Sequence, residues 1–216
     1  MTERRRFKTD DIDKFFDYGI SLPSRTIYLG SGSYDSEGNE SGVDGFLTER
    51  TIKSLHLLDN ADSQADAGNK PITIIMNSIG GDQNHGMGIY DAIRSCKNFI
   101  EIKVYGYAMS MGALILQAGD KRLMAENSSM MIHYGQSGYF GHAPTSHKWD
   151  EESKKLDKWS ENVYLQRIRA SKGNHNFPLK KLREWMMTDT FFNAEEAIGW
   201  GLADEIIKRY ESPKLQ

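Results

Sequence analysis

A single serine stands between two methionines where an apolar, strand-like run changes into a helix-like run. In the segment YGYAMSMGALILQAG this serine is Ser110. Serine is a favoured residue at the N-cap of a helix. A hydroxyl at a helix start is also a possible nucleophile, provided that a general base lies within hydrogen-bond reach. The segment by itself favours the cap, so the choice depends on the rest of the chain.

Two further residues have the types that would activate such a serine. His133 ends the strand-like run SSMMIHYG, and functional groups of parallel sheets gather where strands end and loops begin. Asp189 lies in the polar turn of TDTFFNAEEA, although spacing alone does not separate it from Glu184 or Asp204. A structural histidine and a turn-forming aspartate are the alternatives. With Ser110 they predict a nucleophile, a base and an orienting acid.

A glycine turn supplies the remaining part of an acyl-transfer site. The segment NSIGGD follows a continuous apolar run, and consecutive glycines let a backbone expose its N–H groups to an anion. The backbone N–H groups of Gly81 and of Met111, the residue after the serine, are the expected donors to a tetrahedral oxyanion. Glycines in a turn are more often only a turn, so this interpretation depends on Ser110 lying nearby.

The elements that must position these residues alternate along the chain. The apolar run PITIIMNS (71–78) is typical of a strand buried on both faces. Strand, helix, strand and helix in succession predict an α/β fold with a parallel sheet and crossover helices. Thr48 is the expected cap of a helix over 47–60, and Asn193 with Glu196 has capping-box spacing. The expected strands are 25–30, 71–78, 100–108, 128–135 and 202–207, and the expected helices are 47–60, 87–96, 110–119, 148–172, 179–187 and 193–201.

Composition narrows the class of protein. The 216 residues suit one substantial domain, and 27 Lys and Arg against 30 Asp and Glu give a net charge of -3, which predicts no nucleic-acid surface. The single cysteine, Cys96, allows no disulfide within the chain and is interpreted as a packing residue. Because there is neither a membrane-length apolar run nor an apolar core of a secretory signal, the expected location is the cytoplasm.

Motifs for cofactors and metals fail when their spacing is checked. GSGS at 30–33 lacks the third glycine of a dinucleotide fingerprint, and no glycine loop is followed by the Lys-Ser or Lys-Thr of a P-loop. His142 and His147 are five residues apart, a gap that does not place two imidazoles on one helix face. We therefore expect no bound cofactor and no metal.

Five stretches in order resemble one family, the proteolytic subunits of the Clp protease (ClpP, peptidase family S14). They are MNSIGGD, GMGIYD, AMSMGA, MIHYGQSGYFG and DTFFNAEEAIGWGLAD, and they extend from about residue 71 to residue 207. Carried over residue by residue, the resemblance implies that Ser110 is the nucleophile, His133 the base and Asp189 the orienting acid. It likewise implies oxyanion donors at Gly81 and Met111.

The resemblance also implies a fold and an assembly. The fold would be a ClpP/crotonase-like α/β fold of repeated βαβ units with a protruding handle helix at about 148–173. The peptidase domain would span 25–210, between an N-terminal segment (1–24) and a C-terminal tail (211–216). Heptameric rings stacked into a tetradecamer would enclose the serines in a chamber, and a separate AAA+ unfoldase would use ATP to feed in unfolded polypeptides.

Several departures from the family pattern indicate a divergent or phage-like member. Ile79 replaces a proline before the two glycines, Gly135 and Gln136 open a different loop after the histidine, and the polar stretch 31–45 resembles an insertion. Positions expected to receive an unfoldase are more polar here, with Thr73, Ser95 and Lys103 beside the retained Ile75 and Tyr105.

Three functions follow from these observations. The first is a serine endopeptidase with a Ser-His-Asp triad. The second is a crotonase-like acyl-CoA enzyme, which would use the same oxyanion geometry but needs no nucleophilic serine and usually has a glutamate. The third is a non-catalytic ring subunit, which would be favoured if a triad position were substituted. Because all three positions hold the required residues, the peptidase is the preferred prediction.

Overall fold

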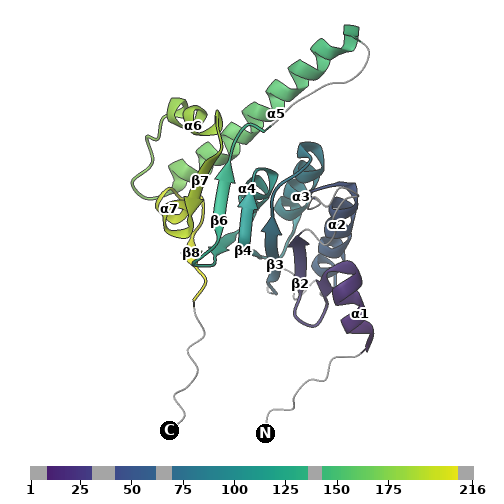
Figure 1. Cartoon of the computed structure of the whole chain (residues 1–216). Coiled ribbons are helices and arrows are strands. Elements are labelled where there is room, and N and C mark those ends of the chain that lie inside the picture. Colours follow the sequence, from purple (N-terminus) through teal and green to yellow (C-terminus); the bar gives the residue numbers. More distant parts are fainter. Residues whose placement is uncertain (1–8, 31–41, 62–69, 136–142, 209–216) are drawn as a thin grey trace, which may run out of the picture.

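The computed structural model describes residues 9–30, 42–61, 70–135 and 143–208 (Figure 1). The strands are β1 (Ile20–Ser21), β2 (Thr26–Gly30), β3 (Ile72–Ser78), β4 (Ile100–Met109), β5 (Lys121–Met124), β6 (Ser129–Ile132), β7 (Thr190–Asn193) and β8 (Glu205–Ile206). The helices are α1 (Thr9–Tyr18), α2 (Gly45–Asp59), α3 (Gln83–Ser95), α4 (Met111–Leu116), α5 (Ala143–Ala170), α6 (Leu179–Met186) and α7 (Ala194–Gly199).

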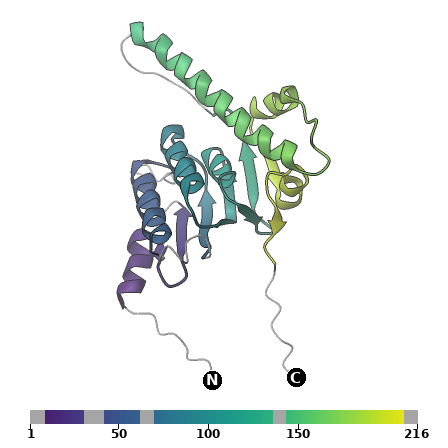
Figure 2. The ribbon, with the colours of Figure 1, turned by 180° about the vertical axis from the view of Figure 1, so that it is seen from behind.

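One eight-stranded sheet organises the chain. Its hydrogen-bonded order is β1-β2-β3-β4-β5-β8, with β6 pairing both β4 and β7. All neighbouring pairs are parallel except β1 with β2 and β6 with β7. Seen from behind, α2, α3 and α4 lie along one side of the sheet (Figure 2). The predicted α/β class, with parallel strands joined by crossover helices, is confirmed.

Strand β4 changes its neighbour along its length. Its first part, Glu101 to Val104, pairs with β5, whereas Tyr107 to Met109 pair with β6. Between the two parts, Gly106 has a φ of +87°, and a Cβ there would lie 2.5 Å from the Asn77 side-chain oxygen. The bend at this glycine directs the end of β4 toward β6, the strand that precedes His133.

The core is apolar and lies between the sheet and its helices. Ile72, Ile74 and Met76 of β3 are fully buried, but the alternate residues Thr73 and Ile75 are only partly buried. The prediction of a strand buried on both faces is therefore wrong for this chain, because a helix layer covers one face of β3 more completely than the other.

Helix caps test the sequence predictions closely. The expected cap at Thr48 is wrong: α2 begins at Gly45, and the Asp44 carboxylate accepts a bond of 2.7 Å from the Leu47 N–H. The Thr48 hydroxyl is buried and instead donates to the His85 carbonyl. By contrast, α7 has the predicted capping box, in which Asn193 and Glu196 each bond the backbone N–H of the other.

Helix α5 differs in its bounds from the expectation. It has 28 residues and runs from Ala143 to Ala170, so it begins and ends earlier than the predicted 148–172. Its first half extends beyond the rest of the domain (Figure 1), while its second half includes the buried residues Tyr164 and Ile168.

Four elements are absent from the sequence predictions, namely helix α1 and the short strands β1, β5 and β7. Strands of two to four residues carry too few positions to show alternation. Helix α1 has Phe15 packed edge-on against Tyr28 of β2, with 4.8 Å between ring centroids. The polar stretch 31–41 lies outside the described residues. Within the described part of the chain, no helix is both long and apolar enough to cross a membrane.

Candidate active site

Ser110 occupies a strained turn between β4 and α4. Its φ of 50° and ψ of −120° are unusual for a residue with a side chain, and such a conformation costs on the order of 1–3 kcal/mol. Its N–H donates to the Met131 carbonyl of β6 at 2.8 Å, which ties the turn to the neighbouring strand. A serine on a sharp strand-to-helix turn has its hydroxyl raised above the sheet edge, as in the nucleophile elbow of hydrolases.

Ser110 occupies the N-cap position of α4. Its hydroxyl makes no capping hydrogen bond to a backbone N–H of the described residues. Its Oγ lies 2.7 Å from Nε2 of His133 instead. The capping interpretation that the isolated segment favoured is therefore wrong. The cause is tertiary, because the imidazole comes from His133, which directly follows the neighbouring strand β6.

The same imidazole contacts a carboxylate on its other side. His133 Nδ1 lies 2.9 Å from Asp189 Oδ1. His133 directly follows β6 and Asp189 directly precedes β7, and the antiparallel pairing of Ile132 with Thr190 brings the two together. Asp204, an alternative acid from the sequence, bonds Arg122 near the start of β5. Of the acids considered, Asp189 is the one that reaches the histidine.

The side chains of His133 and Asp189 differ in exposure. The His133 side chain is 22% exposed and that of Asp189 is 59% exposed. Solvent weakens the electrostatic part of such a contact. In this single chain, the Asp189 carboxylate therefore orients the imidazole chiefly through the geometry of the hydrogen bond.

The glycine turn lies directly against the serine. A Cβ at Gly80 would lie 2.6 Å from the Ser110 Cβ and 3.1 Å from the Met111 nitrogen, so only glycine allows this approach. In the bridge between Val43 and Gly81, the bonds to Val43 are made by the Gly80 carbonyl and the Asp82 N–H. The N–H of Gly81 takes no part in those two bonds, and that of Met111 is the first of α4, where intrahelical partners do not exist.

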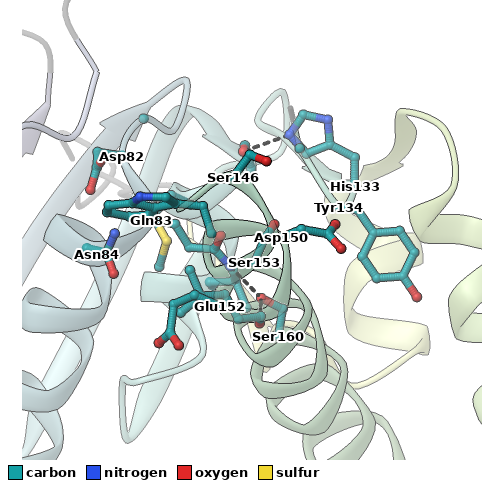
Figure 3. A pocket seen from close by; sticks show the side chains of 17 residues that line it. Asp82, Gln83, Asn84, His133, Tyr134, Ser146, Asp150, Glu152, Ser153 and Ser160 are labelled. Carbon is teal, nitrogen blue, oxygen red and sulfur yellow. Dashed lines mark hydrogen bonds between the residues drawn. The ribbon is translucent and has the colours of Figure 1, made fainter. Parts of the chain in front are cut away.

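A cavity of about 750 Å³ opens beside the serine (Figure 3). The site residues Ser110, His133, Gly81 and Met111 lie on its wall. The rest is formed mainly by the start of α3 and by α5, through Asp82, Gln83, Asn84, Ser146, Trp149, Asp150, Glu152, Ser153, Leu156 and Ser160. Gln83 Nε2 donates to Ser160 Oγ at 3.3 Å and joins the two helices across it. The cavity's size lies within the ordinary range of ligand sites, and its wall carries both polar and apolar side chains.

A cluster that the sequence did not reveal lies behind the histidine. The Tyr134 hydroxyl donates to Glu161 Oε1 at 2.5 Å, and Arg183 donates to both oxygens of that carboxylate at 2.8 and 2.9 Å. Burial alone would raise the pKa of Glu161, but the bonds from Arg183 and Tyr134 outweigh it and lower the pKa. Burial and the Glu161 contact raise the pKa of the Tyr134 hydroxyl. The three residues are far apart in sequence, so no local pattern indicated them.

Among the described residues, no group of three or more His, Cys, Asp and Glu side chains could hold a metal ion. His147 contacts Glu151 at 3.5 Å on α5, and His142 lies outside the described residues. The expectation of a site without metal or cofactor stays a prediction.

Comparison with known proteins identifies the family. The sequence model of the Clp protease family matches residues 39–210. The chain is 30% identical to an ATP-dependent Clp protease proteolytic subunit of Deinococcus radiodurans over 88% of its length and 83% of that protein. It is 33% identical to the chloroplastic ATP-dependent Clp protease proteolytic subunit 3 of Arabidopsis thaliana over 86% of its length, which is 54% of that longer protein. The chain therefore belongs to the Clp protease family of serine-type peptidases.

Proposed function

We propose that this chain is an endopeptidase that cleaves unfolded polypeptides through Ser110, His133 and Asp189. The observation that carries the proposal is the continuous series of contacts from Ser110 Oγ to His133 Nε2 (2.7 Å) and from His133 Nδ1 to Asp189 Oδ1 (2.9 Å). A hydroxyl, an imidazole and a carboxylate in this order can activate a nucleophile at neutral pH. Membership of a serine-type peptidase family supports the same reading.

In the acylation half of the reaction, Ser110 Oγ attacks the carbonyl carbon of the scissile peptide while its proton passes to His133 Nε2. This transfer requires the imidazole tautomer with its proton on Nδ1, and the bond from Nδ1–H to Asp189 favours that tautomer. When the tetrahedral intermediate collapses, the C–N bond breaks and the leaving amine takes the proton from Nε2. The product is an ester between Ser110 and the acyl half of the substrate.

The deacylation half uses the same groups in reverse. Water gives a proton to His133 Nε2 as its oxygen attacks the ester carbonyl, and the second tetrahedral intermediate expels Ser110 Oγ, which recovers that proton. In both halves the negative oxygen is bound by the N–H groups of Gly81 and Met111. Donors of this kind contribute about 2.7–4 kcal/mol each to the transition state.

The active form is proposed to be a homo-oligomer of stacked heptameric rings, with a separate ATP-driven unfoldase as partner. The exposed first half of α5, which carries Trp149 at 55% exposure, supports a role in contacts between subunits. The names of both relatives describe ATP-dependent proteolytic subunits, and the sequence lacks a P-loop, so ATP would be used by the partner. We place this assembly in the cytoplasm, where an unpaired thiol such as Cys96 is usual.

The first experiment uses a fluorophosphonate probe on the full chain, with the adduct located by mass spectrometry. Attack by Ser110 Oγ on phosphorus with loss of fluoride is expected, so the adduct should be found on Ser110 of the wild type. It should be lost in His133→Ala, while Tyr18→Phe, at the exposed end of α1, should label like the wild type. An assembled, folded protein without an adduct on Ser110 would overturn the proposal.

The second experiment addresses the assembly. Sedimentation of the wild type should give a mass of fourteen chains, and a folded substrate should be degraded only when an unfoldase and ATP are added. An unfolded substrate such as casein should be cleaved more readily than the folded one without ATP. A monomeric protein that cleaves folded substrates unaided would contradict both parts.

A further inference from the structure

The backbone at His133 is held by strand pairing only on its N-terminal side, through β6. Strand β6 ends at Ile132, whose register partner is Thr190 of β7. His133 lies one residue beyond this ladder, and Gly135, with a φ of +81°, begins a change of direction two residues later. Since a base must be held within a few tenths of an ångström of its partners, the far side of His133 needs its own anchor.

Tyr134 has the contacts of such an anchor. Its N–H donates to the Met186 carbonyl at the end of α6 (2.9 Å), and its hydroxyl donates to Glu161 of α5 (2.5 Å). The Tyr134 and His133 side chains diverge (Figure 3), so Tyr134 holds the backbone from which the imidazole extends toward Ser110. Two bonds in different directions fix both the position and the orientation of this residue.

Glu161 is suited to hold the tyrosine firmly. Its side chain is only 8% exposed, and Arg183 binds both carboxylate oxygens. A bidentate guanidinium fixes the plane of a carboxylate, so the oxygen offered to Tyr134 has a defined direction. The lowered pKa of Glu161, set by these bonds against the opposing effect of burial, keeps the acceptor ionised.

Helix α6 serves both ends of the proposed catalytic contact. On the His133 side it supplies the Met186 carbonyl and, through Arg183, the hold on Glu161. On the Asp189 side, the Thr190 hydroxyl donates to the Trp185 carbonyl at 2.8 Å. Helix α6 therefore anchors the backbone on both the histidine side and the aspartate side. It is itself held in the core by the buried residues Leu182 and Met186.

We infer that Tyr134, held by Glu161 and Arg183, is a positioning residue that sets His133 against both Ser110 and Asp189. This inference rests on the proposed function. The tyrosine acts through the histidine and takes no proton from the substrate. Misplacement of a catalytic group by about 1 Å can cost on the order of a hundredfold in rate, so loss of one of its two anchors should be visible in turnover.

The test compares Tyr134→Phe with the wild type and with the matched control Tyr18→Phe, at the exposed end of α1, in peptide hydrolysis by the full chain. The phenylalanine keeps the ring and leaves Glu161 bound to Arg183, so the fold should persist with nearly unchanged Tm. We expect kcat to fall roughly tenfold to fiftyfold with KM within about twofold, and Tyr18→Phe to match the wild type. A raised KM with unchanged kcat would overturn the inference by making Tyr134 a substrate contact.

Two further variants separate positioning from bulk stability. Glu161→Gln keeps an oxygen acceptor for the tyrosine and should retain most of kcat, whereas Glu161→Ala should lose as much as Tyr134→Phe. In an Asp189→Asn background, where the orientation of the imidazole is already lost, Tyr134→Phe should have less than about a twofold further effect. Equal effects in both backgrounds would show that Tyr134 acts independently of the histidine and would overturn the inference.

The outcomes also distinguish this inference from the proposed function. A wild-type chain without turnover would overturn the proposed function and this inference with it. A wild type that turns over peptide as expected, beside a Tyr134→Phe variant of equal kcat, would overturn the inference alone.

Discussion

Helix α4 and the first half of α5 differ in what stabilises them. All six residues of α4 are buried, and its length is less than two turns. Residues 145–159 of α5 are mostly exposed and carry ion pairs one turn apart, including Lys154 with Asp150 and Lys155 with Glu152, each at 2.6 Å. A short helix is stable only through tertiary packing. The turn at Ser110 is therefore held by the core, whereas the protruding half of α5 depends on local propensity.

The largest effect in this comparison is expected at Ser110. Ser110→Ala removes the proposed nucleophile from the rigid turn and should reduce kcat by at least about a thousandfold. Because the surrounding core is unchanged, Tm should stay near that of the wild type. Peptide hydrolysis and thermal unfolding on the same sample check both parts. Residual turnover within tenfold of the wild type would remove Ser110 from the mechanism.

Ser110→Gly tests whether the backbone at Ser110 is strained. The variant should be equally inactive, but its unfolding free energy should rise by about 1 kcal/mol because glycine adopts the positive φ without strain. Chemical denaturation measures the difference between Ser110→Gly and Ser110→Ala. Equal stabilities would mean that the turn stores no strain.

The next largest effect is expected from a change in the packing around the turn at Ser110. Gly80→Ala places a Cβ 2.6 Å from the Ser110 Cβ and 2.8 Å from the Met109 carbonyl oxygen, at a φ of +100°. Backbone cannot yield as a flexible side chain does, so we expect a loss of about 2–4 kcal/mol in unfolding free energy and a loss of activity. Gly173→Ala is the comparison, since a Cβ at that positive-φ glycine meets no described atom within 4 Å. Equal losses would assign the effect to backbone strain alone.

A carboxylate at the edge of the core should have a smaller, pH-dependent effect. The Asp59 carboxylate accepts bonds from the N–H groups of Lys97 and Asn98 and so ties α2 to the segment before β4. Burial alone would raise the pKa of Asp59, but these bonds outweigh it and lower the pKa. A carboxyl group whose pKa is lower in the folded state adds stability above its unfolded pKa and loses it as the pH falls through the folded value.

Asp59→Asn should accordingly lower the unfolding free energy by about 1 kcal/mol at neutral pH, and the difference from the wild type should close in acid. Denaturation at a series of pH values from neutral downward measures it. A difference that grows as the pH falls would contradict the sign of the pKa shift.

The smallest effect is expected on the exposed half of α5. Lys154→Ala and Lys155→Ala each remove a solvated ion pair, and such pairs contribute little to stability. The thermal unfolding of a dissociated chain should not change measurably. A large drop in Tm would show that this half of the helix depends on its ion pairs, and would contradict the expectation that helix propensity alone maintains it.

Much of the fold was accessible from local patterns. The apolar run at 71–78 and the alternation of strands and helices gave β3, α3, β4 and α4 in order, and the Asn193–Glu196 spacing gave the cap of α7. The short strands β5 and β7 escaped because four residues show no clear period. The predicted cap at Thr48 was wrong because Asp44, at the end of a polar stretch, caps the same helix four residues earlier.

The sequence by itself determined which residue types were available for chemistry, since Ser110, His133 and Asp189 were singled out by their place at the ends of strands and turns. Only the tertiary structure decided what each one does with its hydrogen bonds. The Ser110 hydroxyl contacts His133 instead of capping α4 because β6 pairs with the end of β4. Asp189, and not Asp204, contacts His133 because β7 pairs with β6. Tyr134, Glu161 and Arg183 meet through packing of α5 and α6. Contacts between residues distant in sequence are set by strand pairing and helix packing, which no short segment encodes.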